Sequence, residues 1–249
     1  MARLWRAYDA TLSEASAQDE RRISGDDAHH LRKVLRLAVG ERIELFDGQG
    51  QVWVAEVLSI DPLAVTVRLL HPVDHLVEAT LPLTLFQARL RGEKMEWVLQ
   101  KATELGLRRV VIFDAELCDA PPIKPNKLER WRRIVLEATK QSGRSRLLEI
   151  ETASHLAPSA GPESALILDP ESGDRSPASF LPAGRFDAGI WLAVGPESGF
   201  SAAELESARG GGWQPAGLGA RILRTEGAGL VAATILLHQA GDLGTFSPV

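Results

Sequence analysis

Two glycine-containing loops between residues 195 and 224 hold the residues whose types and spacing could bind a ligand and act on it. The first loop, Gly195–Phe200, follows the apolar run Ile190–Val194, and the second, Leu218–Arg224, precedes the apolar stretch Thr225–Leu237. Glycine lets backbone N–H and C=O groups approach a ligand closely, and ligands of open α/β sheets bind beyond the carboxyl ends of the strands. Because neither loop has the Gly-Lys-Ser/Thr ending of a phosphate-binding loop, we expect a ligand held by backbone and apolar contacts. Ordinary turns of an α/β protein are the alternative interpretation.

The helices expected after these loops would position them. Ser201, with Glu204 three residues later, has the pattern of a capping box, so a helix should begin there. Thr225 is a candidate N-cap for a second helix that runs to about Leu237. That helix is apolar nearly all round, which predicts burial against a sheet or a second subunit. Since its apolar surface exceeds what one sheet face needs, we expect a homodimer.

The composition is that of an ordinary soluble globular protein. The 249 residues are 45% hydrophobic and 24% charged, enough for one large or two small domains. No apolar run reaches the ~20 residues of a membrane span, and no apolar leader is evident. The single cysteine, Cys118, excludes an internal disulfide and a cysteine-based metal site, and it suits a reducing cytoplasm. The net charge of -5 argues against a non-specific nucleic-acid binder, although local basic clusters can still recognise RNA.

Residues 1–72 predict a small β-rich domain. Strands are expected at Arg42–Phe46, Gln51–Ser59 and Ala64–Leu70, after a short helix from His29 to about Leu37. Short strands at close spacing favour a compact barrel. The helix carries three basic side chains that could contact RNA phosphates: Arg32, Lys33 and Arg36. A solvated helix face is the alternative, and no metal site is expected in the chain.

Residues 73–249 predict an α/β domain, because strand-like and helix-like segments alternate. The expected strands before the first glycine loop are Leu83–Ala88, Arg109–Phe113, Leu147–Glu151 and Ser164–Leu168. The expected helices in the same region are Glu93–Leu105, with Gly106 as its C′ residue, and Leu128–Gln141.

Several of these motifs together resemble a known family. GPESGF at 195–200 followed by LGARILRTEGA at 218–228 is similar to the SPOUT (trefoil-knot) RNA methyltransferases. Within them the chain resembles the RsmE-type 16S rRNA uridine-N3 methyltransferases, which act on the uridine numbered 1498 in the family name. Supporting segments are HHLRKVLRLAVGE at 29–41, KMEWVLQKATELG at 94–106 and EATKQSGR at 137–144. The resemblance covers nearly the whole chain.

This resemblance implies a fold, a cofactor and a site. It implies a PUA-like RNA-binding domain over 1–72 and a SPOUT methyltransferase domain over 73–249 whose C-terminal segment threads through a loop as a knot. The methyl donor would be S-adenosyl-L-methionine, and the substrate 16S rRNA of the small ribosomal subunit. The implied cofactor contacts are Leu168, Gly195, Pro196, Glu197, Leu218, Gly219, Ile222, Leu223 and Arg224.

Methylation at N3 of uracil requires the loss of a weakly acidic proton. Catalysis therefore needs in-line positioning together with a base or stabilisation of the developing uracil anion. Arg224 is the candidate for stabilising the anion and Glu226 the candidate base, with a helix-dipole carboxylate as the alternative role for Glu226. Arg144 and Arg221 are candidate RNA contacts, with structural ion pairs as the alternative.

The chain departs from the family pattern at several positions. Ser198 stands where the first loop commonly has glycine, which would be strained if that position needs a positive φ. The second motif commonly reads TETA, and here Gly227 follows Glu226 where threonine is common. The segment Glu116–Pro121 lacks the family's usual Ser/Glu/Arg-rich character. Two other functions stay open at this point: a non-catalytic RNA-binding assembly factor, and a SPOUT enzyme that methylates the ribose 2′-OH.

Overall fold

The computed structural model divides the chain into two compact units. It describes residues 4–74, 77–157, 164–172, 175–181 and 189–244. Unit 1 contains Met1–Glu78 and Thr139–Leu147, and unit 2 contains Ala79–Ala138 and Leu148–Val249. The sequence had assigned residues 73–78 and 139–147 to the second domain, whereas their contacts group them with the first.

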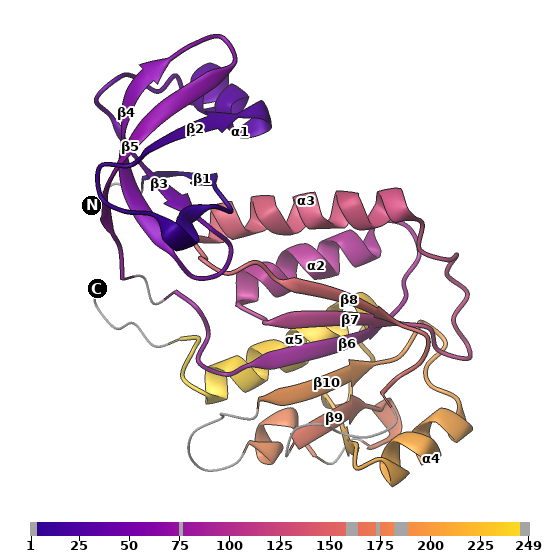
Figure 1. The fold of residues 1–249 in the computed structure, drawn as a ribbon. Coiled ribbons are helices and arrows are strands. Elements are labelled where there is room, and N and C mark those ends of the chain that lie inside the picture. Colours follow the sequence, from indigo (N-terminus) through magenta and orange to yellow (C-terminus); the bar gives the residue numbers. More distant parts are fainter. Residues whose placement is uncertain (1–3, 75–76, 158–163, 173–174, 182–188, 245–249) are drawn as a thin grey trace. The chain divides into compact units, whose positions relative to one another are not determined.

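Unit 1 is built on a five-stranded sheet with the strand order β1-β3-β4-β5-β2 (Figure 1). Its strands are β1 (Trp5–Tyr8), β2 (Glu20–Ser24), β3 (Arg42–Phe46), β4 (Val52–Ile60) and β5 (Ala64–Pro72). Its helical segments are the 3-10 turn η1 (Leu12–Glu14), the short α1 (Gly25–His29) and the π-helical turn η2 (His30–Val34). The three central strands agree with the sequence prediction to within two residues at each end.

The helix of unit 1 differs from its prediction at both ends. It begins at Gly25 rather than His29, and the π-helical turn that continues it ends at Val34. Arg36 has a φ of 53°, a left-handed conformation that stops the helix before the predicted end at Leu37. Arg32 and Lys33 therefore lie on the helical turn, whereas Arg36 lies beyond it.

A buried ion pair holds the segment 139–147 within unit 1. Glu78 Oε2 lies 2.9 Å from Arg144 Nη2, and the other carboxylate oxygen accepts hydrogen bonds from the N–H groups of Ser145 and Arg146. On the other side of this turn, Arg6 Nη1 donates to the carbonyl oxygen of Arg144 at 2.6 Å. These contacts explain why residues far apart in the sequence belong to one unit.

Unit 2 is an α/β unit with a six-stranded sheet, and every strand pair in it is parallel. The strand order is β11-β9-β10-β6-β7-β8. The strands are β6 (Leu83–Ala88), β7 (Arg109–Phe113), β8 (Glu149–Ala153), β9 (Ser164–Leu168), β10 (Ile190–Val194) and β11 (Gln214–Ala216). The helices are α2 (Lys94–Leu105), α3 (Pro125–Ser142), α4 (Ala202–Gly210) and α5 (Thr225–Gln239), with 3-10 turns η3 (Pro170–Ser172) and η4 (Pro177–Phe180). α3 crosses from unit 2 into unit 1 at its last turn.

Helices cover both faces of this sheet (Figure 1). α5 packs on one face so closely that a Cβ at Gly229 would lie 2.9 Å from Leu85 Cδ1 and 3.0 Å from Val194 Cγ2. Phe86, on the opposite face, packs in a cluster with Ala208 of α4 and with Trp213. Small residues in α5 thus permit the close helix–sheet contact that its apolar sequence predicted. No described helix is long and apolar enough to cross a membrane.

Candidate active site

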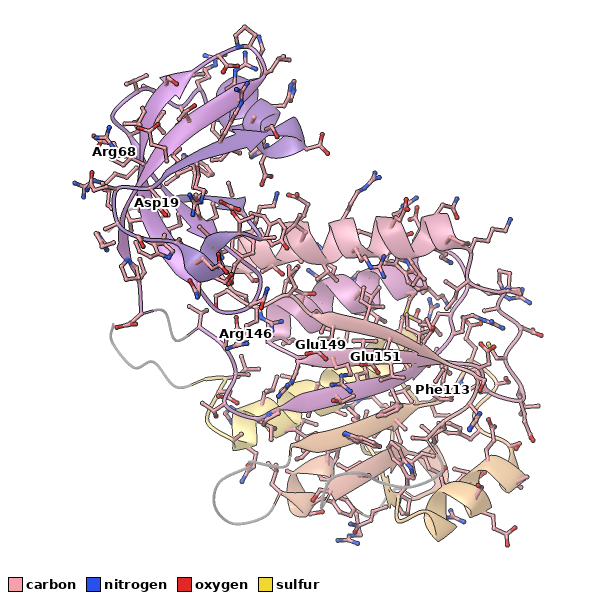
Figure 2. The ribbon with its side chains drawn as sticks, in the orientation of Figure 1. Asp19, Arg68, Phe113, Arg146, Glu149 and Glu151 are labelled. Atoms are coloured by element: carbon pink, nitrogen blue, oxygen red, sulfur yellow. The ribbon has the colours of Figure 1, made fainter. Side chains whose placement is uncertain are left out.

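The loops of interest follow neighbouring strands of the parallel sheet. Because β11, β9, β10, β6 and β7 are adjacent and parallel, their carboxyl ends share one edge. Figure 2 labels Phe113, the last residue of β7, at this edge. Leu168 ends β9, Gly195 follows β10 and the segment 217–224 follows β11, as expected for a ligand site of an α/β sheet.

The second glycine loop presents backbone and apolar side chains to solvent. Gly219 has a φ of 89°, and a Cβ built there would meet no atom within 4 Å. The Ile222 side chain is 86% exposed, and Leu223 is also exposed. Exposed apolar side chains beside an open glycine turn are suited to cover a ligand.

Thr225 joins the two glycine loops. Its hydroxyl donates to the carbonyl oxygen of Gly195 at 2.5 Å and accepts from the side-chain amide of Gln87 at 3.3 Å. The sequence predicted Thr225 as the N-cap of α5, but the cap position is Arg224 and Thr225 is the first helical residue. The threonine hydroxyl therefore fixes the first loop instead of capping its own helix.

Lys94 brings two carboxylates of the site together. Its ammonium group bonds to Glu197 in the first loop and lies 3.6 Å from Glu226 Oε1 at the start of α5. The hydrogen bond from Lys94 is the main cause that lowers the pKa of Glu197 below its ordinary value, and the same bond raises the pKa of Lys94. Glu197 is therefore held in its ionised form.

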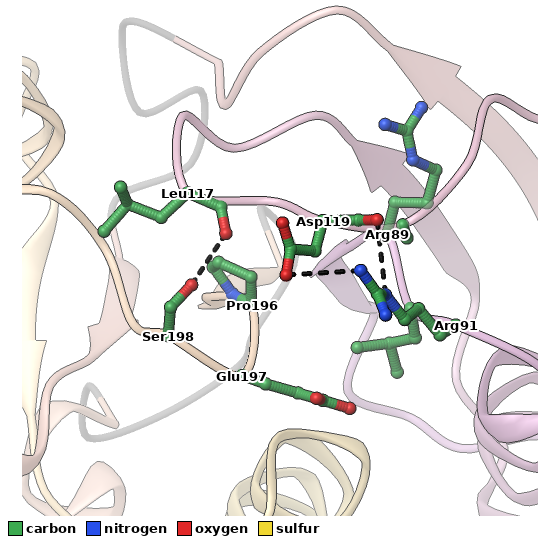
Figure 3. Close-up of a pocket in the computed structure, with 9 residues that line it drawn as sticks. Arg89, Arg91, Leu117, Asp119, Pro196, Glu197 and Ser198 are labelled. Atoms are coloured by element: carbon green, nitrogen blue, oxygen red, sulfur yellow. Dashed lines mark hydrogen bonds and ion pairs between the residues drawn. The ribbon is translucent and has the colours of Figure 1, made fainter.

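A pocket of about 310 Å³ opens beside the first loop (Figure 3). Three loops line it, and the lining residues are Arg89, Leu90, Arg91, Leu117, Asp119, Ala120, Pro196, Glu197 and Ser198. Its walls combine apolar side chains with two guanidinium groups and two carboxylates. Such a mixture fits a flat polar ring, whose faces are apolar and whose edge forms hydrogen bonds.

Comparison with known proteins identifies the family. The family model described as "RNA methyltransferase domain" matches residues 77–237, and the model "RNA methyltransferase PUA domain" matches residues 23–70. The chain belongs to this RNA methyltransferase family.

Individual relatives of the RNA methyltransferase agree with this assignment. The Ribosomal RNA small subunit methyltransferase E of Synechocystis is 37% identical over 86% of this chain and 70% of its own length. The protein of the same name from Bacillus subtilis is 28% identical over 87% of this chain and 89% of its own. A solved structure of the Neisseria gonorrhoeae protein of that name, bound to S-adenosyl methionine, is 29% identical. It superimposes with a TM-score of 0.83 and covers 94% of this chain and 97% of the other.

The fold expected from the sequence is confirmed: a PUA domain is followed by an α/β methyltransferase unit with a parallel sheet, similar to solved SPOUT-type relatives. Threading of the C-terminal segment through a knot stays a prediction. The sheet in unit 1 is five-stranded, as described above.

The predicted RNA contacts of the methyltransferase differ in their surroundings. Lys33, Arg36 and Arg221 are exposed, and Arg32 is half-buried and donates to the carbonyl oxygen of Pro62. Arg144 is only 3% exposed, and its guanidinium is paired with Glu78. This matches the alternative role expected for Arg144, a structural ion pair.

Ser198 is not strained in the RNA methyltransferase. The residue with a positive φ in this loop is Gly199, at 79°, so a serine at 198 needs no left-handed backbone. Its hydroxyl donates instead to the carbonyl oxygen of Leu117 at 2.7 Å. The departure from the common glycine thus adds a contact between two pocket loops.

Sequence reasoning did not single out four residues at this site. Lys94, Arg91 and Asp119 were hidden among many charged residues, and Gln87 lay in an apolar strand. Their role at the site becomes visible only in the structure, because Gln87, Arg91 and Lys94 lie at or just after the carboxyl end of β6 and Asp119 lies in the loop after β7. A polar glutamine at the end of an otherwise apolar strand was the one available signal.

Proposed function

We propose that this chain methylates N3 of the uridine numbered 1498 in the family name, in 16S rRNA, with S-adenosyl-L-methionine as the donor. The family assignment supports the broader activity, rRNA methylation of the small subunit. The observation that carries the finer proposal is the small pocket with guanidinium and carboxylate groups beside the first glycine loop. Its chemistry suits the imide edge of uracil.

The loops fit the proposed methyl donor. S-adenosylmethionine has no phosphate, and these loops offer open backbone at Gly219, apolar walls from Leu168, Ile222 and Leu223, and an ionised Glu197. An anionic group is favourable near a sulfonium cation. The residues proposed to hold the donor are Leu168, Gly195, Pro196, Glu197, Leu218, Gly219, Ile222, Leu223 and Arg224. When bound, the donor would supply an electrophilic methyl group.

Arg224 and Glu226 are proposed to act around the reacting base. Arg224 is exposed at the N-cap of α5 and could stabilise negative charge on a uracil oxygen. Glu226, the second residue of α5, is the base proposed from the sequence. Its Oε1 atom lies 3.6 Å from Lys94, and Glu226 is not among the described residues that line the pocket. A structural carboxylate is therefore the competing role for it.

The N-terminal unit is proposed to grip RNA near the target. Arg32, Lys33 and Arg36 would contact backbone phosphates there, and Arg221 would do so near the site in unit 2. Such contacts would supply affinity that the net charge of -5 does not. The target base must be unpaired or extruded to expose N3, and an rRNA substrate implies a cytoplasmic enzyme.

The decisive experiment uses small ribosomal subunits from cells that lack this activity. The subunits are incubated with the protein and labelled S-adenosylmethionine, and the nucleosides are identified by mass spectrometry. Label in 3-methyluridine is the expected result. Label in a 2′-O-methylated nucleoside would contradict N3 specificity, and failure to bind the donor or transfer label would favour an assembly factor. Subunits that already carry the modification serve as the negative control.

We also propose a homodimer formed through the face of α2 and α5. These helices pack together, and each exposes a large apolar side chain: Trp97 is 44% exposed and Val231 is 41% exposed. Such side chains on adjacent helices suit a contact with a second copy of the chain. Light scattering should give twice the chain mass, and Val231→Glu should reduce it. Leu63→Glu, at an exposed position of unit 1, is the matched control, and a wild-type monomer would refute the proposal.

A further inference from the structure

The pocket in unit 2 contains an arginine–aspartate pair whose hydrogen-bonding pattern matches one edge of uracil. We propose that Asp119, oriented by Arg91, accepts the N3 proton of the target uridine and thereby selects uracil and assists methylation. This inference rests on the proposed function and deepens it. It assigns a role to Asp119, in the segment Glu116–Pro121 that departs from the family pattern, and to Arg91 in the loop after β6.

Arg91 and Asp119 hold each other at two points. Arg91 Nη2 lies 3.2 Å from Asp119 Oδ2, and Arg91 Nε donates to the backbone oxygen of Asp119 at 3.3 Å. Figure 3 shows the two side chains pointing toward one another beside Pro196. Because Asp119 binds the guanidinium through both its backbone and its side chain, two contacts orient the pair.

The loop that carries Asp119 is anchored through the three residues that precede Asp119. Leu117 O accepts the Ser198 hydroxyl at 2.7 Å, and the Cys118 thiol donates to Arg89 O at 3.2 Å. One residue earlier, the N–H of Glu116 donates to Glu204 Oε1 at 3.0 Å. Three consecutive residues are thus tied to three different segments, which presets the position of the next carboxylate.

The pair offers a donor and an acceptor side by side. A guanidinium has five N–H donors and a carboxylate has about four acceptor positions, so both retain capacity after binding each other. Uracil presents the carbonyl oxygen O4 next to the N3–H group. O4 can accept a hydrogen bond from Arg91, and N3–H can donate one to Asp119. Cytosine has an acceptor at N3, and the carboxylate would repel it. The pocket of about 310 Å³ lies at the small end of ligand sites, as suits one extruded base.

The proton released in the reaction needs an acceptor. The N3–H bond breaks as the N3–C bond forms, and the donor's C–S bond breaks with its electron pair left on sulfur. One proton therefore leaves per methyl group transferred. The Asp119 side chain is 88% exposed, so after accepting this proton it can release it to water. Arg91 would meanwhile stabilise the negative charge that develops on O4.

The other carboxylates near the pocket are less suited to this role. The Glu197 carboxylate is engaged by Lys94 at the start of α2 rather than by Arg91. Its side chain also extends away from Asp119 in Figure 3. Glu226 faces Lys94 and is outside the described pocket lining. Asp119 is the carboxylate that both lines the pocket and stands beside a guanidinium at its rim.

The test compares the full-length protein with Asp119→Asn on unmethylated small subunits. The amide oxygen can still accept the N3–H bond but cannot take the proton. We expect the turnover rate to fall about 10²–10⁴-fold, with subunit binding in the absence of donor changed by less than about threefold. Between pH 6 and 8 the variant rate should rise about tenfold per pH unit, because reaction then depends on uridine already ionised in solution. The wild-type rate should change far less over this range.

Two variants make the outcome specific. Asp119→Glu keeps a carboxylate and should restore the shallow pH profile even if the rate stays low. Glu93→Gln removes an equally exposed carboxylate, also 88% exposed and paired with an arginine, but one that does not line the pocket. It should behave as the wild type.

The possible failures are distinguishable. If the wild type does not produce 3-methyluridine, the proposed function fails. If the wild type produces it and Asp119→Asn keeps full rate and the wild-type pH profile, the role of Asp119 is overturned. The same conclusion follows if Glu226→Gln, rather than Asp119→Asn, acquires the steep pH dependence.

Discussion

The Ser198 hydroxyl donates a 2.7 Å hydrogen bond to the carbonyl oxygen of Leu117, which ties the loop after β10 to the loop after β7. The first of these loops is proposed to hold the methyl donor and the second to form a wall of the base pocket. A residue type that departs from the family pattern therefore links the two binding regions. This link should influence how well the pocket is organised.

We predict that Ser198→Ala raises the KM for small subunits about 2- to 10-fold. A neutral hydrogen bond contributes roughly 0.5–1.5 kcal/mol, and its loss would loosen the pocket wall. Steady-state kinetics at saturating donor measure the effect. Ser179→Ala is the matched control, because its hydroxyl makes a bond of the same length within a single 3-10 turn. Equal kinetics in both variants would show that the link has no role in binding.

Unit 1 should be sensitive to the loss of Glu78. Glu78→Gln removes the carboxylate that pairs with the buried Arg144 and binds two backbone N–H groups. Hydrogen bonds to charged groups contribute about 1.5–3 kcal/mol, so the free energy of unfolding should fall by about that amount at pH 7. Urea denaturation followed by fluorescence measures this change. Glu104→Gln, in the surface pair with Lys101, should change it by less than about 0.5 kcal/mol.

The stabilisation that Glu78 provides should also depend on pH. Burial would raise the pKa of Glu78, but Arg144 and the N–H groups outweigh burial and hold this pKa below its ordinary value of 4.5. The stabilisation is therefore present above about pH 4.5 and is lost as the pH falls through the lowered native pKa. The difference between wild type and Glu78→Gln should shrink on acidification below that pH. A constant difference down to pH 3 would contradict this account.

The sequence predicted the strands at the centre of unit 2 well. β6, β7, β9 and β10 begin and end at the predicted residues, because buried parallel strands are continuous apolar runs between clear breaks. It missed β11, whose three residues include a proline, because so short a strand has no periodicity. The first glycine loop follows the correctly predicted β10, whereas the second follows the missed β11.

Other features depended on contacts between distant residues. β1 contains Arg6 and β2 has the sequence ERRIS, and neither resembles an apolar strand. The burial of Arg6 depends on Glu44 and on carbonyl groups of the segment 139–147, which local patterns do not reveal. The same holds for Arg144, whose partner Glu78 is 66 residues away. Pairing of this kind decides whether a basic residue is available to RNA.

Thr225→Val should weaken the donor site. The substitution keeps the shape of the side chain but removes the hydroxyl that binds Gly195 O and accepts from Gln87. Leaving buried polar groups without partners costs about 1–3 kcal/mol, and the first glycine loop would lose its anchor. We expect the Kd for S-adenosylmethionine, measured by calorimetry, to rise about 5- to 100-fold. Thr234→Val, which removes a hydroxyl bonded within α5, should leave this Kd within about twofold.

The basic residues near the π-helical turn of unit 1 should affect RNA binding and its salt dependence. Replacing Arg32, Lys33 and Arg36 with alanine removes three proposed phosphate contacts. Each contact contributes about 0.7–0.9 to the slope of log K against log salt, so the slope should become shallower by about 2–3. Filter binding of small subunits over a range of salt concentrations measures this slope.

The matched control for this experiment is an equal change of charge in unit 2. Alanine substitutions at Arg108, Arg109 and Arg130 remove three positive charges that lie near Glu149 and Glu96. If this variant changes the salt slope as much as the first, general charge attraction, and not a localised contact in unit 1, is responsible. An unchanged slope in the first variant would refute the proposed grip. In either case the affinity for S-adenosylmethionine should stay constant, because neither set of residues belongs to the proposed donor site.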